Sequence, residues 1–384
     1  MTPVGRRPRV LHVIGSLDVG GAEGQIVEIV RGLAGRFEFH VGLLSSGGPL
    51  EPLARAAGAE IHILSSRTGT MRPALRAWRV ARAQSRLRAL IRRLEPDITH
   101  AWLFEMSLLA AVARWPHRAT PFIVSRRSLV NWIARYPVYF PLSRWTNRQA
   151  DLLLANSKAV RAEVMRKEGV EGRRVEVIYN GVDTTAYAPG PPDDGLRHEL
   201  GLPPGLPVVG MVANLHAYKG HEEVVEAVAA LRGEGHPCAL LFVGRDGDAA
   251  VPLRHLIAER KLPDVVFAGA RPDIPRMLRL MDVFVSASHE EGFSNSILEA
   301  MSTGRAILAT GVGGTVEQIE DGVSGLLVPP HAPIPLLTAL RRLAGDPALR
   351  QALGAAARET ALRKFGLTRA FEETAALYER LLRS

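Results

Sequence analysis

Short runs of apolar and β-branched residues alternate with longer segments of mixed polarity along most of this 384-residue chain. Runs that are apolar at nearly every position are typical of strands buried on both faces of a parallel sheet. The segments between the runs predict covering helices, the first over about Ala22 to Leu33. The expected strands span residues 10–15, 39–44, 97–102, 121–125 and 151–157, and then 207–214, 239–244, 264–269, 282–288 and 306–310.

The series of strands restarts after residues 187–195, YAPGPPDDG, whose proline, glycine and aspartate content is typical of a linker. The sequence therefore predicts an α/β protein with two Rossmann-like domains that face one another, over 1–188 and 189–366. In such sheets ligands bind at the carboxyl ends of the strands, so the residues that follow each strand are the first candidates for a site.

Composition narrows the class of protein. Hydrophobic residues make up 47% and charged residues 23%, which suits large buried cores and excludes a disordered chain. Cys238 is the only cysteine, so neither an internal disulfide nor a cysteine metal cluster can form. No apolar run approaches the roughly 18 residues that span a bilayer. The run at 10–14 is too short for a signal peptide, and a cytoplasmic protein is expected.

The charge is concentrated in the first half, where residues 1–185 hold 28 Lys and Arg against 15 Asp and Glu. A basic half attracts an anionic partner, and basic amphipathic segments with aromatic edges predict contact with the inner face of the cell membrane. Two segments carry this prediction: Arg76, Arg79, Arg82, Arg86 and Arg93 opposite Leu75, Trp78, Leu87, Ile91 and Leu94, and the cluster Arg126, Arg127, Trp132, Tyr136, Tyr139, Phe140, Arg144 and Trp145. The alternative is an ordinary surface helix with solvated arginines. Nucleic acid is not an expected partner, because no recognised binding module is present.

A glycine-rich turn follows the first strand, where Gly20 and Gly21 precede the first helix. Glycine lets the backbone approach a ligand, and the amides of a helix start favour an anion. The turn lacks the Gly-Lys-Ser/Thr of a P-loop, and an ordinary turn would also be rich in glycine. It is therefore a weak candidate by itself.

Lys219, one of five lysines, lies between the expected strand at 207–214 and the following helix. A cation at this place could neutralise a phosphate as negative charge develops on it. The alternative is a solvated loop lysine. In the same half, residues 264–272, which include Arg271, end a strand whose backbone could pair with the edge of a nucleobase, and the glycines at 311–314 suit close approach to a diphosphate.

The segment SHEEGFSNSILEAM, residues 288–301, holds the strongest candidates. Glu291 lies in the turn after a strand, and Ser294, Asn295 and Ser296 offer helix caps and amides. Amides at a helix start favour anions, so Glu291 beside them is expected to bind neutral groups such as sugar hydroxyls, and Glu299 could accept from a ribose diol. Paired glutamates on a solvated helix face are the alternative.

Four segments taken together resemble the large retaining glycosyltransferase family of the GT-B fold called family 4, or glycosyl transferases group 1. They are ANSKAV at 155–160, VIYNGVD at 177–183, EGFSNSILEAMSTGRAILATGVGG at 291–314 and VEQIEDGVSGLLVPP at 316–330. The resemblance covers nearly the whole chain and includes the family's pair of glutamates separated by seven residues. It implies that the second domain binds the donor and the first the acceptor, and that a last helix within 367–384 crosses back to the first domain.

The resemblance also implies roles for single residues. Glu291 would contact the donor sugar, Glu299 would hold the ribose, and Lys219 would face the diphosphate. Asn214 stands where the family usually has a second cation, and Trp102 where it has a histidine that contacts the sugar. The remaining donor-binding residues would be Gly20, Gly21, Arg271, Gly292, Phe293, Ser294 and Asn295, and sugar or acceptor contacts would come from His100, Glu105 and Arg127.

These residues predict transfer of a sugar from a nucleotide sugar to a carbohydrate or lipid-linked acceptor, with a UDP-sugar favoured and GDP-mannose possible as donor. Lys219 and helix-start amides would stabilise the leaving diphosphate while Glu291 orients the sugar. Paired carboxylates also occur in glycoside hydrolases, but these need no phosphate-binding lysine. No metal or cofactor is expected, because no metal-ligand cluster is visible in the sequence. A sugar-nucleotide epimerase and a non-catalytic nucleotide-sugar binding protein remain as alternatives.

Overall fold

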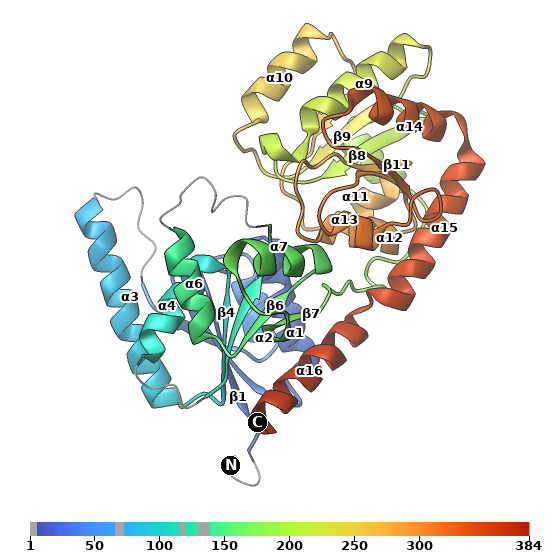
Figure 1. Ribbon diagram of the computed structural model, residues 1–384. Helices are drawn as coiled ribbons and strands as arrows, with labels where there is room; N and C mark the ends of the chain where they lie inside the picture. The colour runs from blue at the N-terminus through green and yellow to red at the C-terminus, as the bar shows by residue number, and fades with distance from the viewer. Residues whose placement is uncertain (1–5, 66–72, 116–119, 130–138, 384) are drawn as a thin grey trace. The chain divides into compact units, whose positions relative to one another are not determined.

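The computed structural model describes residues 6–65, 73–115, 120–129 and 139–383, with the side chains of 73–78 excepted (Figure 1). The chain divides into two units, Met1–Asn180 with Leu367–Ser384, and Gly181–Gly366. Each unit has its own parallel sheet, so the α/β class expected from the run pattern is confirmed.

The first unit is built on a seven-stranded parallel sheet with the strand order β3-β2-β1-β4-β5-β6-β7. The strands are β1 (Arg9–Ile14), β2 (Glu38–Leu43), β3 (Glu60–Ile63), β4 (Ile98–Trp102), β5 (Phe122–Arg126), β6 (Leu152–Ala155) and β7 (Val175–Val177). Its helices are α1 (Gly21–Leu33), α2 (Glu51–Ala56), α3 (Pro73–Leu94), α4 (Phe104–Arg114), α6 (Tyr139–Gln149), α7 (Lys158–Glu168), the 3₁₀ turn η1 (Gly172–Arg174) and α16 (Leu367–Arg383).

Both faces of this first sheet are buried, as the apolar runs require. In β1, Val10 and Ile14 belong to the hydrophobic cluster on one face, while Leu11 and Val13 belong to the cluster on the other. Because successive side chains of a strand point to opposite faces, a strand covered on both sides must be apolar at nearly every position.

The C-terminal helix α16 packs on the first unit, although it follows the second unit in sequence (Figure 1). The hydroxyl of Tyr378 lies 2.7 Å from Nδ1 of His100 on β4, and the Tyr378 ring meets the ring of Phe37 edge-on. A side chain at Gly32 of α1 would collide with the ring of Phe371, so the two helices approach closely at this glycine. The predicted return of the last helix to the first domain is confirmed.

The second unit contains a six-stranded parallel sheet with the order β10-β9-β8-β11-β12-β13. The strands are β8 (Val208–Val212), β9 (Ala239–Val243), β10 (Val265–Phe267), β11 (Val283–Ser286), β12 (Ala306–Thr310) and β13 (Leu326–Val328). The helices are α8 (Asp194–Glu199), the 3₁₀ turn η2 (Ala217–Lys219), α9 (His221–Gly233), α10 (Ala250–Glu259), α11 (Ile274–Leu280), α12 (Asn295–Ser302), α13 (Thr315–Gln318), α14 (Pro333–Gly345) and α15 (Pro347–Lys364).

All ten expected strands are present, while β3, β7 and β13 were missed. Polar residues interrupt the sequences of β3 (EIHI) and β7 (VEV), and the apolar run of β13 has only three residues. The chain passes from the first unit to the second between Asn180 and Gly181, and it returns to the first unit between Gly366 and Leu367. Among the described residues, no helix combines the length and the apolar character that crossing a bilayer requires. The long helix α3, for example, is rich in arginine.

Candidate functional site

The second sheet has a point where its connections change direction, between β8 and β11. From β8 the chain continues to β9 on one side and later returns to β11 on the other, so the loops after β8 and β11 diverge from neighbouring strand ends. Ligands of open parallel sheets bind at such points. The two loops are joined here by a hydrogen bond in which the amide of His289 donates to the carbonyl of Tyr218, at 2.8 Å.

Lys219 and Glu291 meet at this place. Lys219 Nζ donates to Glu291 Oε2 at 2.7 Å, and the two side chains are only 19% and 16% exposed. The turn that carries Lys219 ends at Gly220, which has a φ of +72° and whose Cβ would lie 2.1 Å from the carbonyl oxygen of Ala287. A glycine is therefore required for the β8 loop to approach the β11 loop this closely.

The ion pair keeps Lys219 charged in spite of its burial. Loss of hydration lowers the pKa of Lys219, but the charge and hydrogen bond of Glu291, together with Tyr218 and Glu290, outweigh this effect and hold that pKa above its ordinary value. Lys219 Nζ also lies 5.0 Å from the centre of the Tyr218 ring, which favours a cation there. The site thus offers a permanent positive charge next to a carboxylate.

The N-terminus of α12 lies on the same loop as Glu291. Ser294 caps the helix, with its Oγ accepting from the amide of Ile297 at 3.3 Å. Gln318 of α13 accepts from the Ser294 amide at 3.1 Å and donates to the Ser294 carbonyl at 2.7 Å. The Ser294 amide, expected to bind a ligand, is therefore already engaged within the protein. Asn295 begins the helix after this clamp.

Glu299 follows on α12 and is half-buried. Burial raises the pKa of this carboxyl to about 7, although a hydrogen bond with Tyr187 acts in the opposite direction. Gly292 and Phe293, which lie between the two glutamates in sequence, are buried, and Phe293 packs edge-on against Phe365. Glu299 is thus a carboxyl group that can be neutral or charged near neutral pH.

Asn214 and Arg271 have partners within the second unit. Asn214 Oδ1 accepts from the amide of Arg245, at 3.0 Å, and so joins the loops after β8 and β9. Arg271 makes two hydrogen bonds of 2.8 Å to the carboxylate of Asp273 and one of 3.1 Å to Glu199. The Arg271 guanidinium is therefore neutralised by carboxylates of its own unit.

In the first unit the predicted residues lie after β1, on β4 and in the first turn of α4. Gly20 caps α1 and Gly21 is its first residue, at the carboxyl end of β1. His100 and Trp102 on β4 are fully buried and their rings stack at 4.7 Å, so neither side chain reaches the surface in this structure. Glu105, in the first turn of α4, is exposed.

Arg127 is held by residues of its own unit. Its guanidinium lies 5.0 Å from the centre of the Trp102 ring and donates to Asn180 Oδ1. Burial lowers the pKa of Arg127 to about 10, so the side chain remains charged at neutral pH. Between Trp102 and α4, Leu103 has a φ of +66°, a conformation that L residues rarely adopt.

Sequence reasoning missed His12 and Gln318. Nδ1 of His12 accepts from the indole N–H of Trp102 at 2.9 Å, and burial lowers the pKa of His12 to about 3. A histidine inside the otherwise apolar run of β1 was the available signal. Gln318 carries no such signal in the sequence, because its role depends on the approach of α13 to α12.

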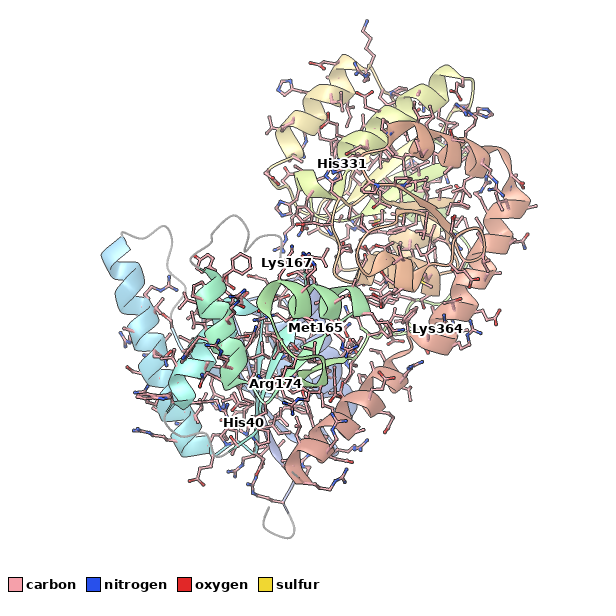
Figure 2. The ribbon with its side chains drawn as sticks, viewed as in Figure 1. His40, Met165, Lys167, Arg174, His331 and Lys364 are labelled. Carbon is pink, nitrogen blue, oxygen red and sulfur yellow. The ribbon has the colours of Figure 1, made fainter. Side chains whose placement is uncertain are left out.

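Two groups of histidine and glutamate side chains come together in the described part of the chain. One consists of His40, Glu60 and His62, and the other of Glu223, His289 and His331 (His40 and His331 are labelled in Figure 2). In the second group, His289 Nε2 lies 2.5 Å from Glu223 Oε1. The expectation that no metal-ligand cluster is present overlooked both groups, because each is assembled from different elements.

The arginines expected on a basic surface differ in their environments. Arg86 donates to the carbonyl of Leu64 at 3.2 Å, and the predicted apolar side of α3 is in contact with the core through Leu87 and Leu94. Arg126 is buried and lies 3.2 Å from Glu168, so it cannot contribute to a surface. The side chains of Leu75, Arg76, Trp78, Trp132 and Tyr136 lie outside the described residues.

Two family models of known proteins match successive parts of the chain. Residues 19–186 match the model of "Glycosyltransferase Family 4", and residues 193–360 match "Glycosyl transferases group 1". A 2-deoxystreptamine glucosyltransferase of Streptomyces kanamyceticus is 30% identical over 253 residues, which is 65% of each chain, and the chain thus spans less than two thirds of that relative. A D-inositol 3-phosphate glycosyltransferase of Streptomyces bingchenggensis is 28% identical over 99% of this chain and 91% of its own.

Solved structures share the fold across both units. HepE of Anabaena in complex with UDP and glucose superposes with a TM-score of 0.85 at 24% identity, covering 97% of this chain and all of that protein. A sucrose-phosphate synthase of Thermosynechococcus elongatus gives a TM-score of 0.82 at 20% identity, over 98% of this chain and 100% of its own. At these identities the likeness is one of fold.

Proposed function

The chain consists of a Glycosyltransferase Family 4 domain followed by a glycosyl transferases group 1 domain, and on this premise we propose that it moves a sugar from a nucleotide sugar to an acceptor with retention of the anomeric configuration. The proposed donor is a UDP-sugar, with GDP-mannose as the second candidate. The proposed acceptor is a carbohydrate or a lipid-linked sugar in polysaccharide or glycolipid synthesis.

The observation that carries this proposal is the contact between Lys219 and Glu291 at the direction change of the second sheet. Breaking the bond between a sugar and a diphosphate leaves negative charge on the leaving group and positive charge on the sugar. A fixed ammonium stabilises the first, and a neighbouring carboxylate orients hydroxyls of the second. Both groups are present here within 2.7 Å of each other.

The pairing also constrains how Lys219 would act. With Glu291 as its partner, the ammonium is held in place before a donor arrives, so little rearrangement is needed when charge develops. Asn214 offers no second cation, because its side chain is neutral and its Oδ1 accepts from Arg245. We therefore expect Lys219 to be the main positive side chain at the diphosphate, and no metal ion to be needed.

Relatives and structural neighbours support the choice of donor but not of acceptor. HepE of Anabaena was solved with UDP-glucose, which favours a uridine nucleotide over GDP for this chain. The curated relatives differ in acceptor, since one is a 2-deoxystreptamine and another a D-inositol 3-phosphate glycosyltransferase. Peripheral contact with an anionic membrane through the basic first half is a separate proposal. Co-sedimentation with vesicles containing anionic lipid would test it.

The function is tested by incubating the purified protein with a panel of UDP- and GDP-sugars and following nucleotide release and binding together. We expect slow release from one donor without any acceptor. In Lys219→Ala the release should fall about 10²- to 10³-fold, the usual loss when one stabilising group of a transition state is removed. Lys364→Ala, at the exposed end of α15, is the matched control and should keep the wild-type rate (Lys364 is labelled in Figure 2).

Other outcomes of the same panel separate the alternatives. Conversion of one nucleotide sugar into another would indicate an epimerase, and tight binding without turnover in the presence of a wide set of acceptors would indicate a non-catalytic binding protein. Equal rates for Lys219→Ala and Lys364→Ala would contradict the proposed role of the ion pair. Once a product is found, the NMR coupling constant of its anomeric proton tests retention.

A further inference from the structure

Four polar side chains gather on one face of the edge of the first sheet. In the parallel pair of β2 and β3, His40 is opposite Glu60 and Gly42 is opposite His62. Residues two apart in a strand point to the same face, so Glu38 and His40 of β2 share a face, as do Glu60 and His62 of β3. The alternate residues Phe39, Val41 and Ile61 belong to the hydrophobic core on the opposite face.

Three side chains of this group bring possible metal-ligand atoms close together. His40 Nδ1 lies 3.1 Å from His62 Nε2 and 3.4 Å from Glu60 Oε2, and His62 Nε2 lies 3.6 Å from Glu60 Oε1. Ligands of a tetrahedral zinc ion at about 2.0–2.1 Å are separated from each other by roughly 3.3–3.4 Å. The Nδ1 of His40 therefore already lies at about this spacing from His62 Nε2 and from Glu60 Oε2, and one ligand atom of each residue lies within 4.8 Å of the other two.

Glu38 fixes the orientation of the His40 ring from the other side. His40 Nε2 lies 2.9 Å from Glu38 Oε1, and only a protonated Nε2 makes this contact favourable. In the neutral imidazole the lone pair is then on Nδ1, which points toward Glu60 and His62. A carboxylate that holds the outer nitrogen of a histidine ligand is the usual second partner in metal sites.

The burial of the group suits a bound ion better than a solvated cluster of charges. The side chain of His40 is 4% exposed and that of His62 is 13% exposed, while Glu60 is 65% exposed and leaves a path for entry.

We propose that His40, Glu60 and His62 bind a divalent transition-metal ion, with Zn²⁺ as the first candidate and solvent in the fourth position. Two imidazoles and one carboxylate favour Zn²⁺ and similar ions over Mg²⁺ and Ca²⁺, which prefer shells of oxygen. The ion would join β3, the four-residue strand at the edge of the described sheet, to its neighbour β2. Its effect is on the stability of the first unit, and it does not depend on the proposed transfer reaction.

The test uses the full chain, purified without a histidine tag and treated with a chelator, and titrated with Co²⁺. Cobalt is a useful probe because its visible absorption is strong when it is four-coordinate and weak when it is hydrated. We expect one equivalent to produce the four-coordinate spectrum, Zn²⁺ to displace it, and Zn²⁺ to raise the thermal unfolding midpoint.

Variants of single residues test which side chains bind the ion. His62→Ala and Glu60→Ala should lose the cobalt spectrum and the thermal shift, and Glu60 is exposed enough for its replacement to leave the fold intact. Glu38→Ala should weaken binding about 10- to 100-fold, the usual effect of removing the second partner of a histidine ligand. His331→Ala, in the other histidine and glutamate group, is the matched control and should bind as the wild type does.

Three results would overturn the proposal. The first is the absence of a four-coordinate spectrum in the wild type. The second is a spectrum that persists unchanged in the folded Glu60→Ala variant. The third is a loss of binding that follows His331→Ala instead, which would move the ion to the group formed by Glu223, His289 and His331.

Discussion

The side chain of Gln318 holds both backbone groups of Ser294. Its Oε1 accepts from the Ser294 amide at 3.1 Å, and its Nε2 donates to the Ser294 carbonyl at 2.7 Å. Gln318 is 1% exposed and Ser294 is 6% exposed, so water cannot replace either bond. The clamp therefore sets the position of the first turn of α12, and with it the loop that carries Glu291.

Gln318→Ala should destabilise the second unit and weaken donor binding together. The buried Ser294 amide would lose its partner, at a cost of about 1–3 kcal/mol, while the Ser294 carbonyl would keep only the amide of Leu298, at 3.3 Å. Urea unfolding followed by circular dichroism measures the first effect, and the KM for the donor measures the second. Gln351→Ala, on the exposed surface of α15, is the control and should stay within about 0.5 kcal/mol of the wild type. An unchanged KM would show that the clamp does not support the donor site.

Glu299 should make donor binding depend on pH. Its pKa is raised to about 7, and only the ionised carboxylate is a full acceptor for a pair of ribose hydroxyls. Between one pH unit below and one above this pKa, the ionised fraction rises about tenfold, so the Kd for a nucleotide sugar should fall about tenfold. A nucleotide sugar is the right ligand, because its diphosphate does not titrate in this range. Glu299→Gln should remove the dependence; if the slope remains in that variant, another group is responsible.

Stability of the first unit should fall in mild acid because of His12 and His100. Burial lowers the pKa of His12 to about 3 and lowers that of His100 as well. Above the unfolded pKa of 6.5 both states are neutral and stability does not change. Below it the unfolded chain binds protons that the folded unit does not, so stability decreases by about 1.4 kcal/mol per pH unit for each such histidine, until the folded pKa is reached.

Tryptophan fluorescence can follow this loss, because all five tryptophans lie within residues 1–180. His12→Gln keeps an acceptor for the indole N–H of Trp102 but does not titrate. The variant should therefore show a shallower decrease of the urea midpoint between about pH 6.5 and pH 4 than the wild type. Parallel curves for the two proteins would exclude His12 as a source of the acid sensitivity.

Arg126 and Glu168 form a buried ion pair, and removing only one of the two side chains should strongly destabilise the first unit. Their Nη2 and Oε2 atoms are 3.2 Å apart, with side chains 7% and 0% exposed, and Glu168 also accepts from Ser143 and Asn147. Glu168→Ala should destabilise the first unit by about 3–5 kcal/mol, because Arg126 would remain buried without its counter-charge. The double variant Arg126→Met/Glu168→Leu should lose less stability, because no unpaired charge remains buried. A double variant less stable than Glu168→Ala would contradict this explanation.

Local patterns in the sequence predict the elements well, and the reason is physical. Strands buried on both faces must be apolar throughout, so ten of them stand out as apolar runs, and the Ser294 cap of α12 follows from residue type alone. The strands β3 and β7 lack this signal because polar residues alternate with apolar ones in them, and β13 offers only three apolar residues. The resemblance to a glycosyltransferase family likewise rests on residues that are contiguous in the chain.

Contacts between distant elements were decided by the tertiary structure. Lys219 and Glu291 are 72 positions apart and meet because β8 and β11 are neighbours in the sheet. Tertiary packing also brings together Gln318 and Ser294, Tyr378 and His100, and His40 with Glu60 and His62. No local sequence pattern predicts these contacts. Sequence periodicity records which face of an element is buried, but not which element covers it. The partners of each polar side chain, and hence its pKa and its chemistry, therefore depend on how the elements pack.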